Sequence, residues 1–127
     1  MASDFQGSGL RTVGVDETGS DEMGLDIGPR TVRAYEGIVN NARTIVWHGP
    51  MGVFENPKFS AGTFAIARAV AASNSFSIVG GGDSASAVIQ SGVREGITHI
   101  STGGGASLEF LSGRKLPGVE ALTDRTA

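Results

Sequence analysis

The sequence predicts an α/β protein with a partial doubly wound parallel sheet of about four strands and flanking helices. Short β-branched and aromatic runs alternate with longer helical patterns, and the connections between them are short. This alternation favours parallel strands joined by right-handed crossovers. Glycine makes up 20 of 127 residues and gathers between these segments, which is typical of turns and ligand-facing loops.

The expected elements follow in order along the chain. Pro29 stands at a favourable first helical position, and Ser60 is a plausible cap for a helix that is apolar nearly all round and so expected to be deeply buried. Gly92 and Gly113 are expected to end the last two helices. The predicted strands span residues 11–15, 44–47, 76–79 and 98–101, and the predicted helices span residues 29–42, 60–73, 83–91 and 103–112.

The chain divides into three parts. Residues 1–10 are expected to be a disordered or expression-derived start, and residues 11–116 form the partial α/β domain. Residues 117–127 are expected to be a tail in which Pro117 and Gly118 prevent a helix from continuing.

Composition argues against several classes of function. The net charge is −3 and no basic cluster occurs, so we expect no nucleic-acid partner. Cysteine is absent, which excludes disulfides and thiolate metal sites. No apolar run approaches the roughly 20 residues of a membrane helix, so we expect no membrane partner and a cytoplasmic protein.

Two triple-glycine loops, GGGDS and TGGGAS, each follow a predicted strand and lead into a predicted helix. A helix N-terminus presents unpaired N–H groups and a partial positive charge, and glycine lets an anion approach that backbone closely. Glycine can also serve only to make a tight turn, but the repetition favours a phosphate site. Neither loop matches the Walker or dinucleotide-binding fingerprints.

Asp83, in the first of these loops, has two interpretations. It is either a simple helix cap or a carboxylate that meets a phosphate through Mg²⁺. Ser84 beside it offers a hydroxyl to a phosphate oxygen. We favour the magnesium interpretation once the phosphate site is accepted.

A third loop, HGPMGVFE at residues 48–55, is suited to a nucleoside. Its apolar or bare residues 50–54 can flank a planar base, and Glu55 can accept hydrogen bonds from ribose. Alternatively, Met51 and Phe54 belong to the core. His48 can be an ordinary loop histidine, His99 is expected to be structural, and their separation makes a zinc site improbable.

At these residues the sequence resembles phosphoglycerate kinase. The stretches TIVWHGPMGVFE, IVGGGDSASAV and HISTGGGASLEFLSGRKLPGVEAL carry the resemblance, with a weaker match at MGLDIGP. It covers roughly Leu10 to the end and implies the C-terminal portion of a Rossmann-like nucleotide-binding domain. In this family that domain binds Mg-ATP or Mg-ADP, and a separate N-terminal domain binds 3-phosphoglycerate or 1,3-bisphosphoglycerate.

The resemblance also implies a role for each site residue. An adenine nucleotide would contact the loop after the first of these stretches, with Glu55 on the ribose. The polyphosphate would face the second loop, with Asp83 towards magnesium, and the third loop would steady the transferring phosphoryl group. The implied nucleotide-binding residues are His48, Pro50, Gly52, Val53, Glu55, Gly81, Gly82, Asp83 and Ser84, and the implied catalytic residues are Gly103, Gly104 and Gly105.

Two departures from the family pattern bear on function. The family usually has Asn where this chain has His48, which affects nucleotide affinity. Neither Lys58 nor Lys115 lies near a glycine loop, and the sequence lacks the N-terminal domain with its basic patch. We therefore expect this polypeptide alone to be inactive as a kinase.

Two alternatives stay open. Instead of the nucleotide-binding part of a kinase, the chain can be a non-catalytic adenine-nucleotide-binding module or a purely structural fragment that keeps the fold without affinity. An exposed sheet edge also predicts a partner, which is either the missing N-terminal part of the enzyme or a self-associated copy.

Overall fold

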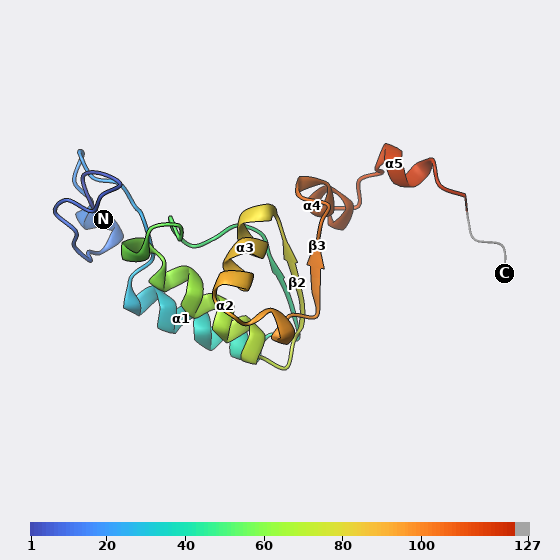
Figure 1. The fold of residues 1–127 in the computed structure, drawn as a ribbon, viewed down its shortest axis with the longest axis horizontal. Coiled ribbons are helices and arrows are strands. Elements are labelled where there is room, and N and C mark those ends of the chain that lie inside the picture. Colours follow the sequence, from blue (N-terminus) through green and yellow to red (C-terminus); the bar gives the residue numbers. More distant parts are fainter. Residues whose placement is uncertain (124–127) are drawn as a thin grey trace.

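A computed structural model describes residues 1–123 of the chain and shows three parallel strands in the order β1-β2-β3 (Figure 1). The strands alternate with helices, so the predicted α/β class is confirmed, with one strand fewer than expected. No helix within the described residues is both long and apolar enough to cross a membrane. The bounds are α1 Pro29–Asn41, β1 Thr44–Trp47, α2 Ala61–Ala72, β2 Phe76–Gly80, α3 Gly82–Gln90, β3 His99–Ser101, α4 Gly105–Leu111 and α5 Pro117–Glu120.

The strand predicted at residues 11–15 is wrong. This segment is irregular and ends in a 3-10 helix at Val15–Glu17. Its alternating pattern has no neighbouring strand with which to pair, and the only isolated bridge in the described part joins Ala2 to Met23. The Arg11 side chain instead pairs with Glu22.

The first ten residues, expected to be disordered or expression-derived, have a defined place in the structure. Ala2 is fully buried in a small cluster with Leu25 and Phe59. Asn56 Nδ2 donates to Phe5 O at 2.7 Å, which joins this segment to the loop after β1. The last four residues of the expected tail, 124–127, lie outside the described residues.

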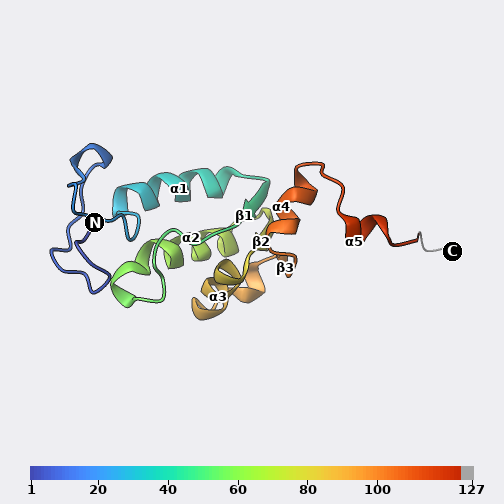
Figure 2. The same ribbon diagram turned by 90° about the horizontal axis from the view of Figure 1, so that it is seen from above.

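The main core lies between the sheet and α2, with α3 beside it. Trp47 and Val79 from adjacent strands pack with Ile66 and Val70 of α2 and Val88 of α3. Helix α2 lies between α1 and α3 in the view from above (Figure 2) and contacts both. The predicted deep burial of α2 therefore holds on its inward faces, while Arg68 on the same helix is exposed.

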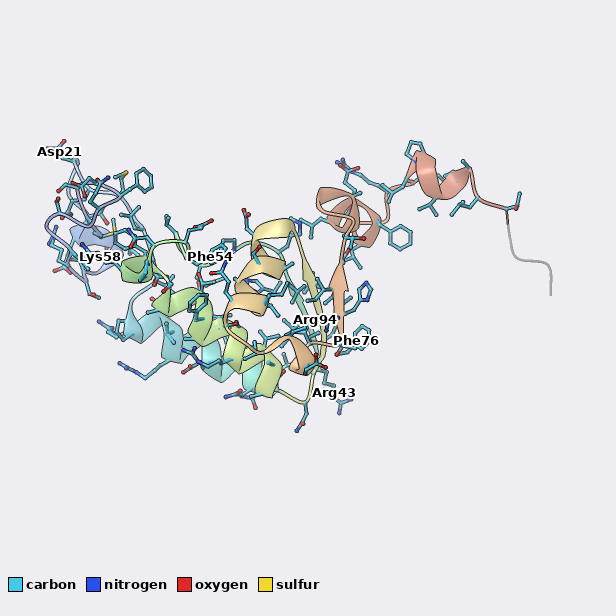
Figure 3. All side chains as sticks on the ribbon, in the orientation of Figure 1. Asp21, Arg43, Phe54, Lys58, Phe76 and Arg94 are labelled. Atoms are coloured by element: carbon cyan, nitrogen blue, oxygen red, sulfur yellow. The ribbon has the colours of Figure 1, made fainter. Side chains whose placement is uncertain are left out.

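The opposite face of the sheet is open to solvent. Val46, Ile78 and His99 share one register row on this face, because Val46 pairs with Ile78 and Ile78 with His99. Val46 is 46% exposed and Phe76 is 54% exposed. Figure 3 labels Phe76 at the start of β2. An apolar face of this kind normally packs against another layer of structure.

The C-terminal segment forms two short helices. Gly113, with a φ of +82°, follows the end of α4 as expected. Helix α4 ends at Leu111 and does not continue through Pro117; instead Pro117 begins a separate four-residue helix, α5, at its N1 position. In Figures 1 and 2, α5 lies beyond α4, away from α1 and α2.

Candidate functional site

The three loops singled out in the sequence begin at one edge of the sheet. Trp47, the last residue of β1, pairs with Val79, and Gly80, the last residue of β2, pairs with Ser101 at the end of β3. Because all three strands are parallel, their carboxyl ends lie side by side with β2 in the centre. This edge is where ligands bind in open α/β sheets.

The loop after β1 is fixed to its surroundings by hydrogen bonds. Trp47 Nε1 donates to Gly49 O at 2.6 Å, so the indole holds the first turn of the loop. The N–H groups of Met51 and Gly52 both donate to Thr63 Oγ1, at 3.0 and 3.2 Å. Thr63 lies fully buried in the first turn of α2, so this loop is anchored to a rigid element.

The side chains of this loop divide between core and surface. Phe54, labelled in Figure 3, is buried. Its ring packs edge-to-face against Phe64 with 6.4 Å between ring centroids. Met51 packs against the main core. The expectation that Phe54 and Met51 flank a base is therefore corrected to the alternative, in which both belong to the core. Glu55 is exposed and Pro50 half-buried, so both are accessible from solvent.

The loop after β2 turns sharply into α3. Gly81 has a φ of +89°, a conformation that side chains rarely adopt. Gly82 begins the helix, and Asp83 is exposed in the first turn. The helix has no side-chain cap hydrogen bond and begins directly after the carboxyl end of β2, so no cap side chain occupies its first N–H groups. This arrangement suits an anion.

Ser84 has a different environment from the one expected. Its side chain is fully buried, and its Oγ accepts a hydrogen bond of 2.6 Å from the N–H of Gly49. Ser84 therefore joins the loop after β1 to the first turn of α3. The sequence predicted that this hydroxyl faces a phosphate oxygen; in the structure it is fully buried and contacts the N–H of Gly49.

His48 lies over the turn at the end of β2. A Cβ added to Gly80 would meet His48 Cδ2 at 2.9 Å, and one added to Gly81 would meet Nε2 at 3.4 Å. The exposed imidazole thus covers two glycines of the phosphate-type loop. A larger residue at Gly80 would displace the ring from this position.

The loop after β3 is shaped by glycine and serine. Gly104 has a φ of +52° and precedes the seven-residue helix α4. The N–H of Gly103 donates to Ser101 Oγ at 3.2 Å, and this oxygen lies 2.5 Å from Ser107 Oγ. Gly103 and Gly105 are exposed at the same edge of the sheet as the other loops.

The lysines make contacts elsewhere. Lys58 Nζ donates to Gln6 O at 2.6 Å, and Lys115 pairs with Glu120 at 3.4 Å. No group of three or more metal-ligating side chains occurs in residues 1–123. Asp83 is thus a single exposed carboxylate beside a helix N-terminus. Mg²⁺ in proteins is usually bound by one or two carboxylates together with substrate phosphates, so this arrangement is compatible with a magnesium site.

Asp26, for which the sequence pattern predicts no role, lies close to the loop after β1. Its side chain is about half-buried, and burial raises its pKa above the ordinary value while hydrogen bonds from the N–H groups of Gly62 and Ile27 oppose the shift. A carboxylate inside an otherwise apolar motif, MGLDIGP, was the available signal. Its partner Gly62 lies 36 residues away, so the sequence does not reveal the contact.

Comparison with known proteins identifies relatives over most of the chain. A family model described as phosphoglycerate kinase matches residues 1–114. The phosphoglycerate kinase of Prosthecochloris aestuarii is 59% identical over 116 residues, which cover 89% of this chain and 29% of the relative. That of Koribacter versatilis is 64% identical over 107 residues, covering 84% of this chain and 27% of the relative.

Solved structures give the same result. Phosphoglycerate kinase from Coxiella burnetii superposes with a TM-score of 0.83 at 42% identity, covering 94% of this chain and 30% of that structure. The enzyme from Pyrococcus horikoshii gives 0.71 at 50% identity, covering 77% and 24%. The chain thus spans less than a third of the length of these relatives.

Proposed function

Because this chain belongs to the phosphoglycerate kinase family, we propose that it forms the part of the enzyme that binds the adenine nucleotide. Members of this family are kinases, that is, phosphotransferases. The proposed reaction transfers a phosphoryl group from 1,3-bisphosphoglycerate to Mg-ADP, giving 3-phosphoglycerate and ATP in glycolysis, in the cytoplasm. The observation that carries the proposal is the meeting of three ligand-type loops at the carboxyl edge of one parallel sheet.

Each loop has its own part in the proposed site. Pro50, Gly52, Val53 and Glu55 receive the nucleoside, with the exposed Glu55 carboxylate accepting from ribose hydroxyls. Gly81 and Gly82 let the polyphosphate approach the N–H groups that begin α3. His48 lies between these two regions, against Gly80 and Gly81.

Magnesium would be held by Asp83 together with phosphate oxygens of the nucleotide. When bound, the ion neutralises charge on the phosphates. The loop of Gly103, Gly104 and Gly105 would bring the N-terminus of α4 close to the transferring phosphoryl group. We assign the contact with the phosphoryl group to backbone N–H groups because Lys58 and Lys115 contact other residues.

We propose further that these 127 residues alone have no kinase turnover. The chain spans 29% of the length of the Prosthecochloris aestuarii enzyme, and phosphoryl transfer depends on positioning both substrates. A coupled assay for ATP formation tests this point. Turnover near that of a full-length homologue would contradict it.

Nucleotide binding separates this proposal from its two alternatives. Titration calorimetry with Mg-ADP should show binding that Asp83→Ala abolishes. A chain that binds nucleotide but does not restore turnover with the rest of a homologue would be a non-catalytic module. A chain that keeps its fold and binds no nucleotide would be a structural fragment.

The exposed apolar face of the sheet favours association with a partner. We propose that the remaining part of a full-length family member covers the face that carries Val46, Phe76 and Ile78. The relatives are more than three times as long as the matched region, and Val46 and Phe76 on this face are about half exposed. A second copy of this chain is the competing occupant.

A further inference from the structure

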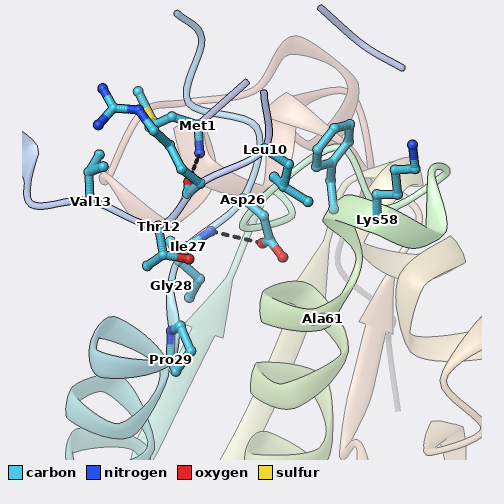
Figure 4. Close-up of a pocket in the computed structure, with 12 residues that line it drawn as sticks. Met1, Leu10, Thr12, Val13, Asp26, Ile27, Gly28, Pro29, Lys58 and Ala61 are labelled. Carbon is cyan, nitrogen blue, oxygen red and sulfur yellow. Dashed lines mark hydrogen bonds between the residues drawn. The ribbon is translucent and has the colours of Figure 1, made fainter. Parts of the chain in front are cut away.

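Asp26 lies at the junction of three segments of the chain. Figure 4 shows its carboxylate between the start of α1 at Pro29 and the start of α2 at Ala61. Asp26 Oδ2 accepts a hydrogen bond of 2.8 Å from the N–H of Gly62, in the first turn of α2. Asp26 Oδ1 accepts one of 2.9 Å from the N–H of Ile27. One carboxylate thus fixes the entry to α1 and the N-terminus of α2.

Residues 51–55, the nucleoside loop, pack directly against this junction. A Cβ added to Gly52 would lie 2.6 Å from Asp26 Oδ1 and 2.5 Å from the carbonyl oxygen of Leu25, so only glycine fits there. The same Leu25 oxygen accepts a hydrogen bond of 2.9 Å from the N–H of Val53. The backbone of residues 52–53 therefore takes its position from the segment that carries Asp26.

A second route runs through α2. Asp26 holds the first turn of this helix at Gly62, and the next residue, Thr63, accepts hydrogen bonds from the N–H groups of Met51 and Gly52. Both oxygens of the Asp26 carboxylate accept, so an amide in its place would turn one acceptor into a donor facing an N–H group. Such a mismatch would disturb both sets of contacts that position the nucleoside loop, those with Leu25 and those with Thr63.

We infer that Asp26 is a positioning residue for nucleotide binding: it holds the nucleoside loop of residues 51–55 in place without touching the ligand. The inference rests on the proposed function for the ligand that is bound. Asp26 lies on the side of the loop that faces the N-terminal segment, in a cavity of about 320 Å³. Its two hydrogen-bond donors are the N–H groups of Ile27 and Gly62, neither of which belongs to the phosphate-type loops at Gly81 and Gly104.

The neighbouring cations are engaged with other groups. Lys58 and Arg11 line the same cavity, but Lys58 donates to Gln6 O and Arg11 pairs with Glu22. The amino group of Met1 donates to Arg11 O at 2.9 Å. The half-buried carboxylate therefore depends on backbone N–H groups, and a helix N-terminus favours its negative charge.

The test compares Asp26→Asn with Asp21→Asn, the same chemical change at an exposed residue of the same segment. Calorimetry measures the affinity of each chain for Mg-ADP and for Mg-pyrophosphate, a probe that lacks the nucleoside. Asp26→Asn should weaken Mg-ADP about tenfold, the equivalent of one charged hydrogen bond, and leave Mg-pyrophosphate within about twofold. Asp21→Asn should change neither affinity.

A purely structural role would give a different result. If Asp26→Asn weakens both ligands equally, or neither, the inference is overturned. Thr63→Val, which keeps the shape and removes the acceptor, provides a second variant should Asp26→Asn fail to fold, and it should show the same selective loss of Mg-ADP.

Hydrogen exchange keeps this inference separate from the proposed function. A wild-type chain that binds neither ligand contradicts nucleotide binding by the chain but leaves Asp26 open to the exchange measurement. In that case the amides of Gly62 and Val53 should exchange faster in Asp26→Asn than in Asp21→Asn, with the amide of Val79 in β2 unchanged. Unchanged exchange at Gly62 and Val53 would overturn the positioning role.

Discussion

The N–H of Gly49 donates a hydrogen bond of 2.6 Å to the Oγ of Ser84, a residue 35 positions further along the chain. This bond joins the loop after β1 to the first turn of α3. It lies inside the protein, where Ser84 is fully buried. The nucleoside side and the phosphate side of the proposed site are therefore one connected structure.

Replacing this serine should be costly. Ser84→Ala leaves the Gly49 N–H without its acceptor, so the free energy of unfolding should fall by about 1–3 kcal/mol. Urea denaturation followed by Trp47 fluorescence measures the change. The matched control is Ser86→Ala at an exposed position of the same helix, where alanine should be neutral or slightly stabilising. Equal effects of the two variants would contradict the importance of the Gly49–Ser84 bond.

Two adjacent glycines should respond oppositely to alanine. Gly81 has a φ of +89°, so Gly81→Ala should lower the free energy of unfolding by about 1–2 kcal/mol. Gly82 has an ordinary helical backbone and open space around an added Cβ, so Gly82→Ala should raise it by up to about 1 kcal/mol. Thermal or urea unfolding of both variants checks the sign. Destabilisation by Gly82→Ala as large as by Gly81→Ala would show that backbone conformation is not the cause.

Acid should weaken the N-terminal segment through Glu22. Hydrogen bonds from Arg11 and from the Gly19 N–H lower the pKa of Glu22 from its ordinary value of 4.5 to about 2. The unfolded chain therefore binds more protons between these two values, and the free energy of unfolding falls as pH falls through this window. Glu22→Gln should remove this part of the dependence, and denaturation at a series of pH values tests it. An identical pH slope in wild type and variant would refute the assignment.

Asp26 should act with the opposite sign. Its pKa is raised by burial, so the folded chain holds the proton more tightly than the unfolded chain. The contribution of Asp26 to the free energy of unfolding therefore falls as the pH rises from the pKa of this carboxyl in the unfolded chain to its raised pKa in the folded chain. Asp26→Asn should therefore make the loss of stability on acidification steeper than in wild type. A shallower slope in the variant would contradict the direction of this shift.

Association tests which partner covers the exposed sheet face. Light scattering should give the mass of a 13.0 kDa monomer for the chain alone and a one-to-one complex with a polypeptide that supplies the rest of a homologous enzyme. Phe76→Ser should weaken that complex, whereas Val15→Ser, at an 89% exposed residue of the N-terminal segment, should not. A stable dimer of this chain alone would favour the second copy instead.

The three observed strands were predictable to within one residue because each is a short β-branched or aromatic run that ends at a loop rich in glycine or proline. The strand at residues 11–15 was wrong because alternation over five residues does not reveal whether a partner strand lies beside it. There the pairing of Arg11 with Glu22 and the Ala2–Met23 bridge replace a ladder.

The candidate site was predictable as three loops but not as a connected whole. Strand order places the loops at one edge, and this follows from alternation and short connections. Contacts across the sequence, such as Gly49 with Ser84 and Asp26 with Gly62, depend on side-chain packing and have no local signal. Phe54 shows the same limit, because an apolar loop residue can face either a ligand or the core.

Calorimetric titration of the chain with Mg-ADP tests the central proposal most directly. We expect saturable binding that disappears when EDTA removes magnesium and when Asp83 is replaced by alanine, while the variant keeps its cooperative unfolding. Folded wild-type chain that binds no Mg-ADP, or that binds it equally well after Asp83→Ala, would contradict the account.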